Sequence, residues 1–490
     1  MSATPPSSVL LSGGTIIVCT EDADSLDVIR DGAVLVTGDR IAGIYDTAHP
    51  SNLPAGTEVV DCTNKIITPG FVDTHRHGWQ TGLKTLASNT TMPDYVNRYP
   101  YGSAALYTAE DVYIGQLAGL LEALNAGVTT TLDHAHHIWS KETTKAGLQA
   151  SIDSGARVYW NHAFTGTPTY PFSEQVANFK EMARTMPKPD KLTTMGVAYD
   201  GWTFAPAEEI QELIGLTKEL KIPVLTTHYL GGPWMADNSP ELLHRHGVLD
   251  TDMAVVFSHA TGINTTDSLL LRETNQYISI TPESEMHCGI NHPNGHLIQD
   301  QAALGVDIFL TFSTDMLTQA RIWLQRTRAR MFDQTLKKWL IPVNNPMSVN
   351  QAFLMATRHG GLALRRPDLG VIRVGAKADL VVFDGRSPGM LGWVDPVAAV
   401  ILHANVGDIE HVLVDGRFRK RDRKLTFEGY GAVVDRFLAS AAKLQKAAVE
   451  TPDPVIEGRF WGGCGYGRAD EVNISRGPGT GYGKQFVHRH

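Results

Sequence analysis

The sequence has few cysteines, little excess charge and no long apolar run. Only four of its 490 residues are cysteines, Cys19, Cys62, Cys288 and Cys464, and no two form a Cys-x-x-Cys pair. This spacing excludes a disulfide-rich scaffold and favours a reducing compartment. No stretch of 18 apolar residues is present, so we expect neither a transmembrane helix nor a membrane partner.

The charge is mild and mixed in sign. Lys and Arg together number 43 against 52 for Asp and Glu, which gives a net charge of −9. The only basic run is the short RKRDRK at 419–424, so a nucleic-acid partner is not expected. The first residues have neither the basic segment nor the apolar block of a signal peptide. We therefore expect a cytoplasmic protein.

The two ends of the chain have similar β-rich patterns. Residues 8–68 alternate short apolar runs with turn signals such as Gly13-Gly14, and 371–417 repeat that pattern. We predict that 1–68 and 371–423 pair into one composite β-sandwich. Residues 424–490 then form a C-terminal helix and a Gly-rich tail that packs on the same chain or on a neighbour.

The middle, 69–370, alternates short β-rich runs with amphipathic helical patterns, which indicates βα units around a parallel sheet. Eight candidate strands end near residues 75, 134, 162, 200, 228, 259, 283 and 315. The last strand is placed at 307–315, and a helix is placed before it at 297–305. The predicted fold class is α/β, a (β/α)₈ TIM barrel with a small β-sandwich. Barrel enzymes build their active sites at the carboxyl ends of the strands.

Histidine is abundant, at 19 residues, and several histidines stand at predicted strand ends. His75 and His77 are two apart on one strand, so their side chains point to the same side. His228 and His259 end the fifth and sixth strands, and Asp315 ends the eighth. Each residue alone is compatible with a role in the core or a loop, but together they predict a metal site.

The sequence resembles the amidohydrolase superfamily, in the branch of cytosine deaminase, guanine deaminase and the triazine hydrolases. The resemblance is carried by ITPGFVDTHRH, THYL, SHATG, STD and the stretch ATRHGGLALRRPDLGVIRVGAKADLVVFD at 356–384. It implies the barrel and the composite sandwich. It also implies four metal ligands, His75, His77, His228 and Asp315. His259 matches a position that either binds the metal or hydrogen-bonds the substrate and water.

The resemblance also bears on the number and kind of ions. Binuclear relatives carry a carboxylated Lys at the end of strand four, where this chain has Asp200, so we expect one ion per chain. Zn²⁺ is the favoured ion, and Fe²⁺ or Mn²⁺ also suits His and Asp ligands. Asp315 is the expected acceptor of a proton from the attacking water, and His259 the expected electrostatic stabiliser.

The chain departs from its relatives at one position. Deaminases of this branch carry a Glu three residues after the strand-five His, and this chain has Gly231. Glu283 and Glu285 are therefore the candidate general acids, although a solvated loop pair is the alternative. The segment DHAHH at 133–137 leaves two interpretations open, a polar loop or a pocket lined by His134 with a second metal.

Residues at the expected barrel mouth suggest how a substrate is bound. We predict five substrate-binding residues, Trp79, Gln80, Tyr229, His259 and His287. The function predicted is a mononuclear metal-dependent hydrolase that acts on non-peptide C–N bonds of small cyclic or aromatic amides, amidines or amino-heterocycles. We expect a small-molecule substrate and a homo-oligomer. The alternatives are a halide-displacing or decarboxylating relative and a non-catalytic barrel scaffold.

Overall fold

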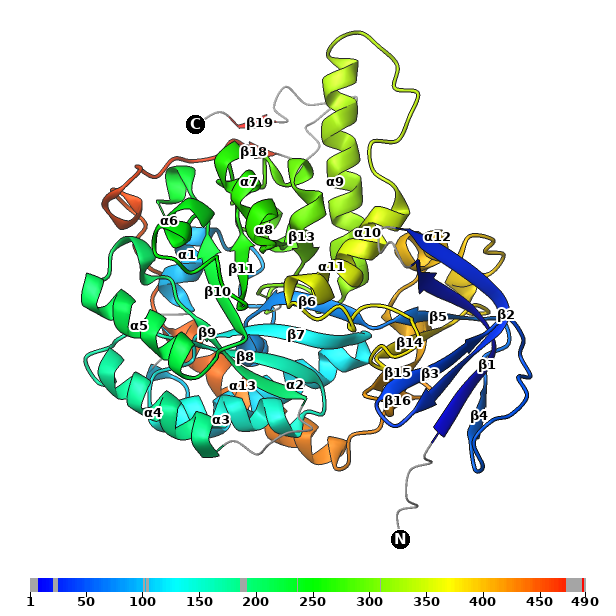
Figure 1. Cartoon of the computed structure of the whole chain (residues 1–490). Helices are drawn as coiled ribbons and strands as arrows, with labels where there is room; N and C mark the ends of the chain where they lie inside the picture. The colour runs from blue at the N-terminus through cyan, green and yellow to red at the C-terminus, as the bar shows by residue number, and fades with distance from the viewer. Residues whose placement is uncertain are drawn as a thin grey trace, which may run out of the picture.

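The computed structural model describes residues 8–20, 25–99, 102, 105–185, 192–235, 237–308, 310–472 and 487–488. Two sheets organise this part of the chain (Figure 1): a barrel of parallel strands, and a mixed sheet at its side that contains strands from both ends of the chain. Among the described residues, no helix is long and apolar enough to cross a bilayer.

The barrel consists of eight parallel strands, each hydrogen-bonded to the next in chain order. They are β6 (Phe71–Arg76), β7 (Val128–Ala135), β8 (Arg157–Ala163), β9 (Thr193–Ala198), β10 (Val224–Tyr229), β11 (Ala254–His259), β12 (Tyr277–Ile280) and β13 (Ala302–Leu304). The barrel closes between the last strand and the first. Just after β13, the N–H groups of Val306 and Asp307 both donate to the carbonyl oxygen of His75. The predicted (β/α)₈ barrel is confirmed.

Helices alternate with the strands and cover the outside of the barrel. The principal ones are α2 (Ala109–Asn125), α3 (Lys141–Asp153), α4 (Phe172–Thr185), α5 (Ala207–Glu219), α7 (Thr265–Thr274) and α9 (Met316–Leu336). Shorter helices are α1 (Met92–Arg98), α6 (Pro240–Arg245), α8 (Pro282–His287), α10 (Val349–Ala356), α11 (Arg358–Ala363) and α12 (Pro396–Ala398). Thr108, Ser140 and Asn264 begin α2, α3 and α7 with reciprocal capping boxes, which satisfy the free N–H groups of the first turn.

The predicted position of the last barrel strand is wrong. The eighth strand, β13, lies at 302–304, inside the predicted helix 297–305, whose remaining residues form short 3-10 turns. In the predicted strand 307–315 the described residues contain only one isolated bridge, at Asp307. The apolar run after Asp307 has the stronger β pattern, whereas Ala302-Ala303-Leu304 forms a strand because it pairs with β12.

The mixed sheet has the strand order β17-β16-β15-β14-β5-β1-β2-β3, with β4 beside β1. Its strands are β1 (Ser8–Cys19), β2 (Leu26–Thr37), β3 (Arg40–Tyr45), β4 (Glu58–Asp61), β5 (Lys65–Pro69), β14 (Leu380–Asp384), β15 (Ile409–Val414), β16 (Arg417–Arg421) and β17 (Lys424–Leu425). The two ends of the chain meet where β5 pairs antiparallel with β14. At the barrel, Arg157 of β8 forms a buried ion pair with Asp379, at 3.0 Å.

The segment after this sheet turns back along the barrel. Helix α13 (Tyr430–Glu450) packs on α2, and Ser440 Oγ donates to Asp111 at 2.7 Å. Further on, the ring of Phe460 meets Trp234 edge-on at 5.6 Å, in the loop that follows β10. The predicted tail therefore packs on its own chain at Phe460, while 473–486 and 489–490 lie outside the described residues.

Candidate active site

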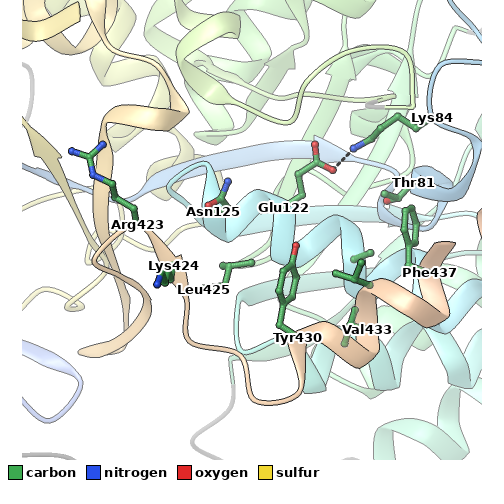
Figure 2. Close-up of a pocket in the computed structure, with 12 residues that line it drawn as sticks. Thr81, Lys84, Glu122, Asn125, Arg423, Lys424, Leu425, Tyr430, Val433 and Phe437 are labelled. Carbon is green, nitrogen blue, oxygen red and sulfur yellow. Dashed lines mark hydrogen bonds and ion pairs between the residues drawn. The ribbon is translucent and has the colours of Figure 1, made fainter. Parts of the chain in front are cut away.

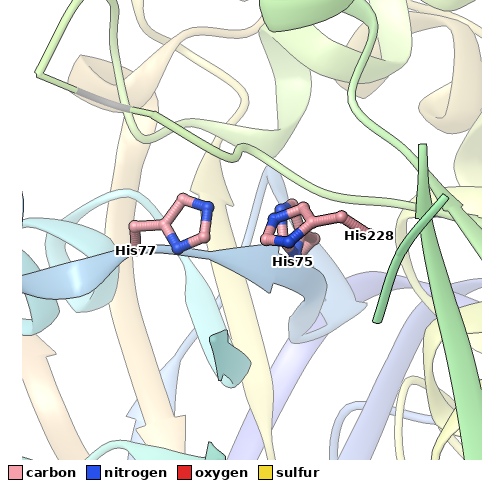
Figure 3. A group of neighbouring side chains, drawn as sticks. All are labelled: His75, His77 and His228. Carbon is pink, nitrogen blue, oxygen red and sulfur yellow. The ribbon is translucent and has the colours of Figure 1, made fainter. Parts of the chain in front are cut away.

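Four histidine rings meet at the carboxyl ends of the barrel strands. His75 and His77 come from the end of β6, and His228 from β10 (Figure 3), while His259 ends β11. The ring centroid of His75 lies 4.8 Å from that of His77, 4.9 Å from that of His228 and 5.2 Å from that of His259. The structure thus brings together all four histidines selected from the sequence.

Each of these rings is held by its Nδ1 atom. Nδ1 of His77 lies 2.8 Å from the carbonyl oxygen of His134. Nδ1 of His228 lies 2.8 Å from the carboxylate of Asp200. Both oxygens can only accept, so these two Nδ1 atoms carry the proton and Nε2 keeps its lone pair. Ser258 and Thr281 hydroxyls lie 2.8 and 2.9 Å from the Nδ1 atoms of His75 and His259.

Asp307 places its carboxylate between the Nε2 atoms. Its Oδ1 lies 3.3 Å from Nε2 of His75 and 3.1 Å from Nε2 of His77, and its Oδ2 lies 3.8 Å from Nε2 of His259. Burial favours the neutral acid, but the neighbouring rings of His75 and His77 outweigh it and hold the pKa of Asp307 well below its usual value.

This donor set fits a divalent cation. Two ligands at about 2.0–2.2 Å from a tetrahedral ion lie about 3.3–3.6 Å apart, close to the distances from Oδ1 of Asp307 to Nε2 of His75 and of His77. His75 Nε2 is buried and has no hydrogen-bond partner among the described residues, as expected of an atom reserved for a ligand. His75, His77 and His228 also place one nitrogen each within 4.8 Å of one another. Burial lowers the pKa of His75 well below its usual value, which favours the neutral ligand form.

Asp315, the carboxylate predicted as a ligand and proton acceptor, lies elsewhere. It caps the N-terminus of α9, where its oxygens accept from the backbone N–H of Thr318 and from Ser313 Oγ, both at 2.6 Å. It belongs to none of the candidate metal clusters in the described chain. The eighth strand ends at Leu304, eleven residues before Asp315, and the carboxylate that lies beside the histidines is that of Asp307.

Asp200 supports the cluster from the end of β9. Its Oδ2 receives the hydrogen bond from His228 and lies 3.6 Å from Nε2 of His134, and its Oδ1 accepts the backbone N–H of His228 at 2.7 Å. Burial opposes ionisation of Asp200, but the charge and hydrogen bonds of His228 lower its pKa. Carboxylates in this position fix the ring and tautomer of a metal-binding histidine.

The segment after β7 adds a histidine that the sequence did not single out. His136 stacks on the ring of His77, with centroids 4.0 Å apart and 23° between planes. Its Nδ1 accepts a 2.9 Å hydrogen bond from the indole N–H of Trp79. Trp79 was predicted to bind substrate, but it is fully buried among aromatic rings. His136 was missed because spacing within DHAHH does not show which ring turns inward.

The backbone at Gly231 explains why that position has no carboxylate. Gly231 has φ 68° and ψ −173°, a region almost exclusive to glycine. A Cβ there would lie 3.0 Å from Cα of Gly262 and 3.2 Å from the ring of Tyr229. Tyr229, a predicted substrate residue, donates its hydroxyl to Asp267 of α7 at 3.1 Å.

The two candidate acids on α8 face different neighbours. Glu285 is buried behind His259: its Oε1 accepts the N–H of Thr281 at 2.9 Å and lies 3.6 Å from Nδ1 of His259. Glu283 accepts a 2.9 Å hydrogen bond from Gln319 of α9. Burial raises the pKa of Glu283 to about 7.

The remaining predicted substrate residues are engaged in hydrogen bonds. His287 Nε2 donates to the carbonyl oxygen of Ala87 at 3.0 Å. Gln80 Nε2 donates to the hydroxyl of Tyr95 at 2.7 Å, and its Oε1 is buried without a partner. The structure therefore gives Gln80 one free acceptor and ties His287 to the loop before α1.

A cavity of about 720 Å³ lies elsewhere, between α2 and α13 (Figure 2). Tyr430 and Phe437 form its apolar wall on α13, and Lys84 pairs with Glu122 across it at 2.5 Å. None of the clustered histidines lines this cavity, so it is separate from the candidate metal site.

Three comparisons with known proteins point to the same family. Residues 66–419 match the amidohydrolase family. The 5-methylthioadenosine/S-adenosylhomocysteine deaminase of Thermococcus kodakarensis is 25% identical over 432 residues, which cover 84% of this chain and 93% of that protein. The structure of an adenosine deaminase from Xanthomonas campestris with bound zinc matches with a TM-score of 0.77 and 18% identity, over 91% of this chain and all of that one.

A second solved structure represents the triazine branch. Atrazine chlorohydrolase from Arthrobacter aurescens, complexed with zinc, matches with a TM-score of 0.75 and 16% identity, over 88% of this chain and 100% of that one. The family match covers well over half of the chain, including all eight barrel strands and β14 and β15 of the mixed sheet. The chain belongs to the amidohydrolase family and is a hydrolase of carbon–nitrogen bonds other than peptide bonds.

Proposed function

We propose that the chain is a mononuclear metal-dependent hydrolase whose single ion is held by His75, His77, His228 and Asp307. The observation that carries the proposal is the convergence of three histidines and one carboxylate, with each ring anchored through Nδ1. Zinc is the favoured ion, since two similar solved structures contain it, and Fe²⁺ or Mn²⁺ remains compatible with these ligands.

When bound, a divalent ion supplies Lewis acidity, which lowers the pKa of water and polarises the group under attack. The protein supplies the proton acceptor and the stabiliser. The carboxylate of Asp307 takes up the proton of the attacking water. Ser284 Oγ donates a hydrogen bond to Oδ2 of this carboxylate at 2.5 Å and so holds it in place. His259, positioned by Thr281, stabilises negative charge that develops on the substrate.

The substrate is a small cyclic or aromatic amide, amidine or amino-heterocycle. The deaminases among the relatives act on adenosine-type compounds by name, which supports a planar nitrogen-bearing ring. Glu283 is the remaining candidate for the general acid, because a carboxyl group with a pKa of about 7 is protonated in about half of the molecules at neutral pH. Glu285 lies behind His259, where it steadies that ring through Thr281.

Halide displacement is a second candidate for the reaction. The backbone at Gly231 excludes the carboxylate that delivers a proton in related deaminases. A halide leaves without needing a proton, and the atrazine chlorohydrolase has the same fold. The two reactions differ in the product that leaves, so they are distinguished by analysis of ammonia, carboxylate and halide.

We also propose a cytoplasmic homo-oligomer. All four cysteines are free, which suits a reducing compartment. After α9, which projects from the barrel in Figure 1, Trp339 is 96% exposed and Val343 94% exposed. Apolar side chains gathered at such a tip support contact with another copy of the chain.

The test is metal analysis combined with a substrate screen. The purified protein, loaded with Zn²⁺, is assayed against amides, lactams, amino-heterocycles and halogenated rings, with ammonia, new carboxylate and halide scored separately. About one equivalent of metal per chain and metal-dependent release of one product support the proposal. Less than about 0.3 equivalents, with no activity after reconstitution, would indicate a non-catalytic scaffold.

A further inference from the structure

We propose that the Nε2–H group of His136 forms a hydrogen-bond donor subsite for the substrate, and that Trp79 positions it. The ligand atom it accepts is a carbonyl oxygen or an unprotonated ring nitrogen beside the reacting carbon. This inference rests on the proposed hydrolase function, and it names the acceptor group that the substrate must carry.

The tautomer of His136 follows from its partner. The indole N–H of Trp79 can only donate, and it lies 2.9 Å from Nδ1 of His136. Nδ1 must therefore present a lone pair, so the single proton of the neutral ring is on Nε2. This is opposite to His77 and His228, whose protons are on Nδ1 and whose Nε2 atoms are free to bind a metal. Nε2 of His136 can therefore donate a hydrogen bond, whereas Nε2 of His77 and of His228 can bind a metal.

The position of His136 places this donor beside the metal cluster. Its ring lies parallel to that of His77 at 4.0 Å. His136 and His228 are half-buried, whereas His75, His77 and His134 are buried. Of these two half-buried rings, His136 is therefore the one whose proton is on Nε2, since that of His228 is on Nδ1.

The rest of the site shows a need for such a donor. Gly231 carries no side chain, and its backbone admits none. Glu285 is turned toward Thr281, and Tyr229 gives its hydroxyl to Asp267. In a neutral ring substrate, the atom beside the reacting carbon is a carbonyl oxygen or a ring nitrogen with a lone pair. Once water is excluded from the site, this lone pair needs a hydrogen-bond donor from the protein. The His136 N–H meets that requirement.

Four variants distinguish the effect of losing the N–H donor from the effect of disturbing the packing of the aromatic rings. Trp79→Phe keeps an aromatic ring in the buried cluster but removes the N–H. Trp139→Phe is the matched control, because Trp139 packs edge-on against Trp79, 5.0 Å away, in the same cluster. His136→Gln restores an N–H donor, and His136→Leu abolishes it. Pyrimidin-4-one, a neutral ring with both acceptor types, is the probe for binding to the zinc-loaded protein.

Two readouts report the inference independently of turnover. In ¹⁵N-labelled protein, His136 is expected as the Nε2–H tautomer, and in Trp79→Phe as a mixture of both tautomers. Trp79→Phe and His136→Leu are each expected to weaken probe binding about 5- to 15-fold, the loss of one hydrogen bond. Trp139→Phe and His136→Gln stay within about threefold of wild type. All four variants keep their zinc.

Other outcomes would overturn the inference. A wild-type His136 protonated on Nδ1 contradicts it, even in an active enzyme. Probe binding by His136→Leu as tight as that of wild type also contradicts it. Failure of the proposed function looks different: the wild-type protein then binds no zinc and turns over no substrate, whatever the tautomer of His136.

Discussion

Oδ1 of Asp307 lies 3.1 Å from Nε2 of His77, across the seam where the barrel closes. The two residues are far apart in the chain but adjacent in the ring of strands, because the carbonyl of Asp307 accepts the backbone N–H of His77. A carboxylate and a histidine placed so close at a strand end have the spacing of two ligands on one ion.

Asp307→Asn is expected to remove the metal site. The change deletes the charge of one ligand, so we predict at least a 100-fold loss of zinc affinity and of activity. Asp315→Asn is the matched control. It keeps an N-cap residue at the start of α9, so the free energy of unfolding falls by at most about 1 kcal/mol and zinc is retained. Competition with a chromophoric chelator measures both affinities, and equal loss in both variants would contradict the assignment.

Asp200→Asn is expected to weaken metal binding without removing a ligand. The amide no longer holds the proton of His228 Nδ1 as strongly, so the ring and its tautomer are less fixed. Loss of such a partner lowers metal affinity by about 10- to 100-fold. The same chelator titration measures it, and an unchanged affinity would show that Asp200 does not orient His228.

Glu283→Gln is expected to alter the pH dependence of stability. Burial raises the pKa of Glu283 to about 7, with the charge of Asp315 adding to the rise and Gln319 opposing it. The unfolded chain releases this proton near pH 4.5, so wild type loses stability as the pH rises from about 4.5 through 7. The loss is at most about 3 kcal/mol.

The variant lacks this titration. Denaturation with urea at pH 5 and pH 8 should therefore show wild type losing stability relative to Glu283→Gln as the pH rises. Parallel curves for the two proteins would contradict a raised pKa. Turnover by the same variant tests the acid role, since full activity in both Glu283→Gln and Glu285→Gln would exclude both residues.

Gly231→Glu is expected to damage the fold rather than restore a proton donor. The new side chain meets Gly262 in a backbone region that only glycine adopts easily, at a cost of about 2–4 kcal/mol. Gly232→Ala is the control, because φ there is 53° and a Cβ meets nothing within 4 Å, so it costs about 1 kcal/mol. Thermal unfolding compares them, and a Gly231→Glu protein as stable as wild type would contradict the packing argument.

The sequence predicted the barrel and the four histidines because both follow from local patterns. Strand ends in a parallel barrel meet at one rim, so a histidine at a strand end is placed by the strand alone. The sequence pointed to Asp315 rather than Asp307 because β13 has only three residues and gains its strand character from pairing with β12. The roles of Asp200 and His136 depend on which way loop side chains turn, and tertiary packing decides that.

The central claim is that one divalent ion binds to His75, His77, His228 and Asp307. Anomalous X-ray diffraction at the zinc edge from crystals of the zinc-loaded protein tests it most directly. We expect one peak per chain, about 2.0–2.2 Å from the three Nε2 atoms and from a carboxylate oxygen of Asp307. A peak on Asp315, two peaks per chain, or none in the histidine cluster would contradict it.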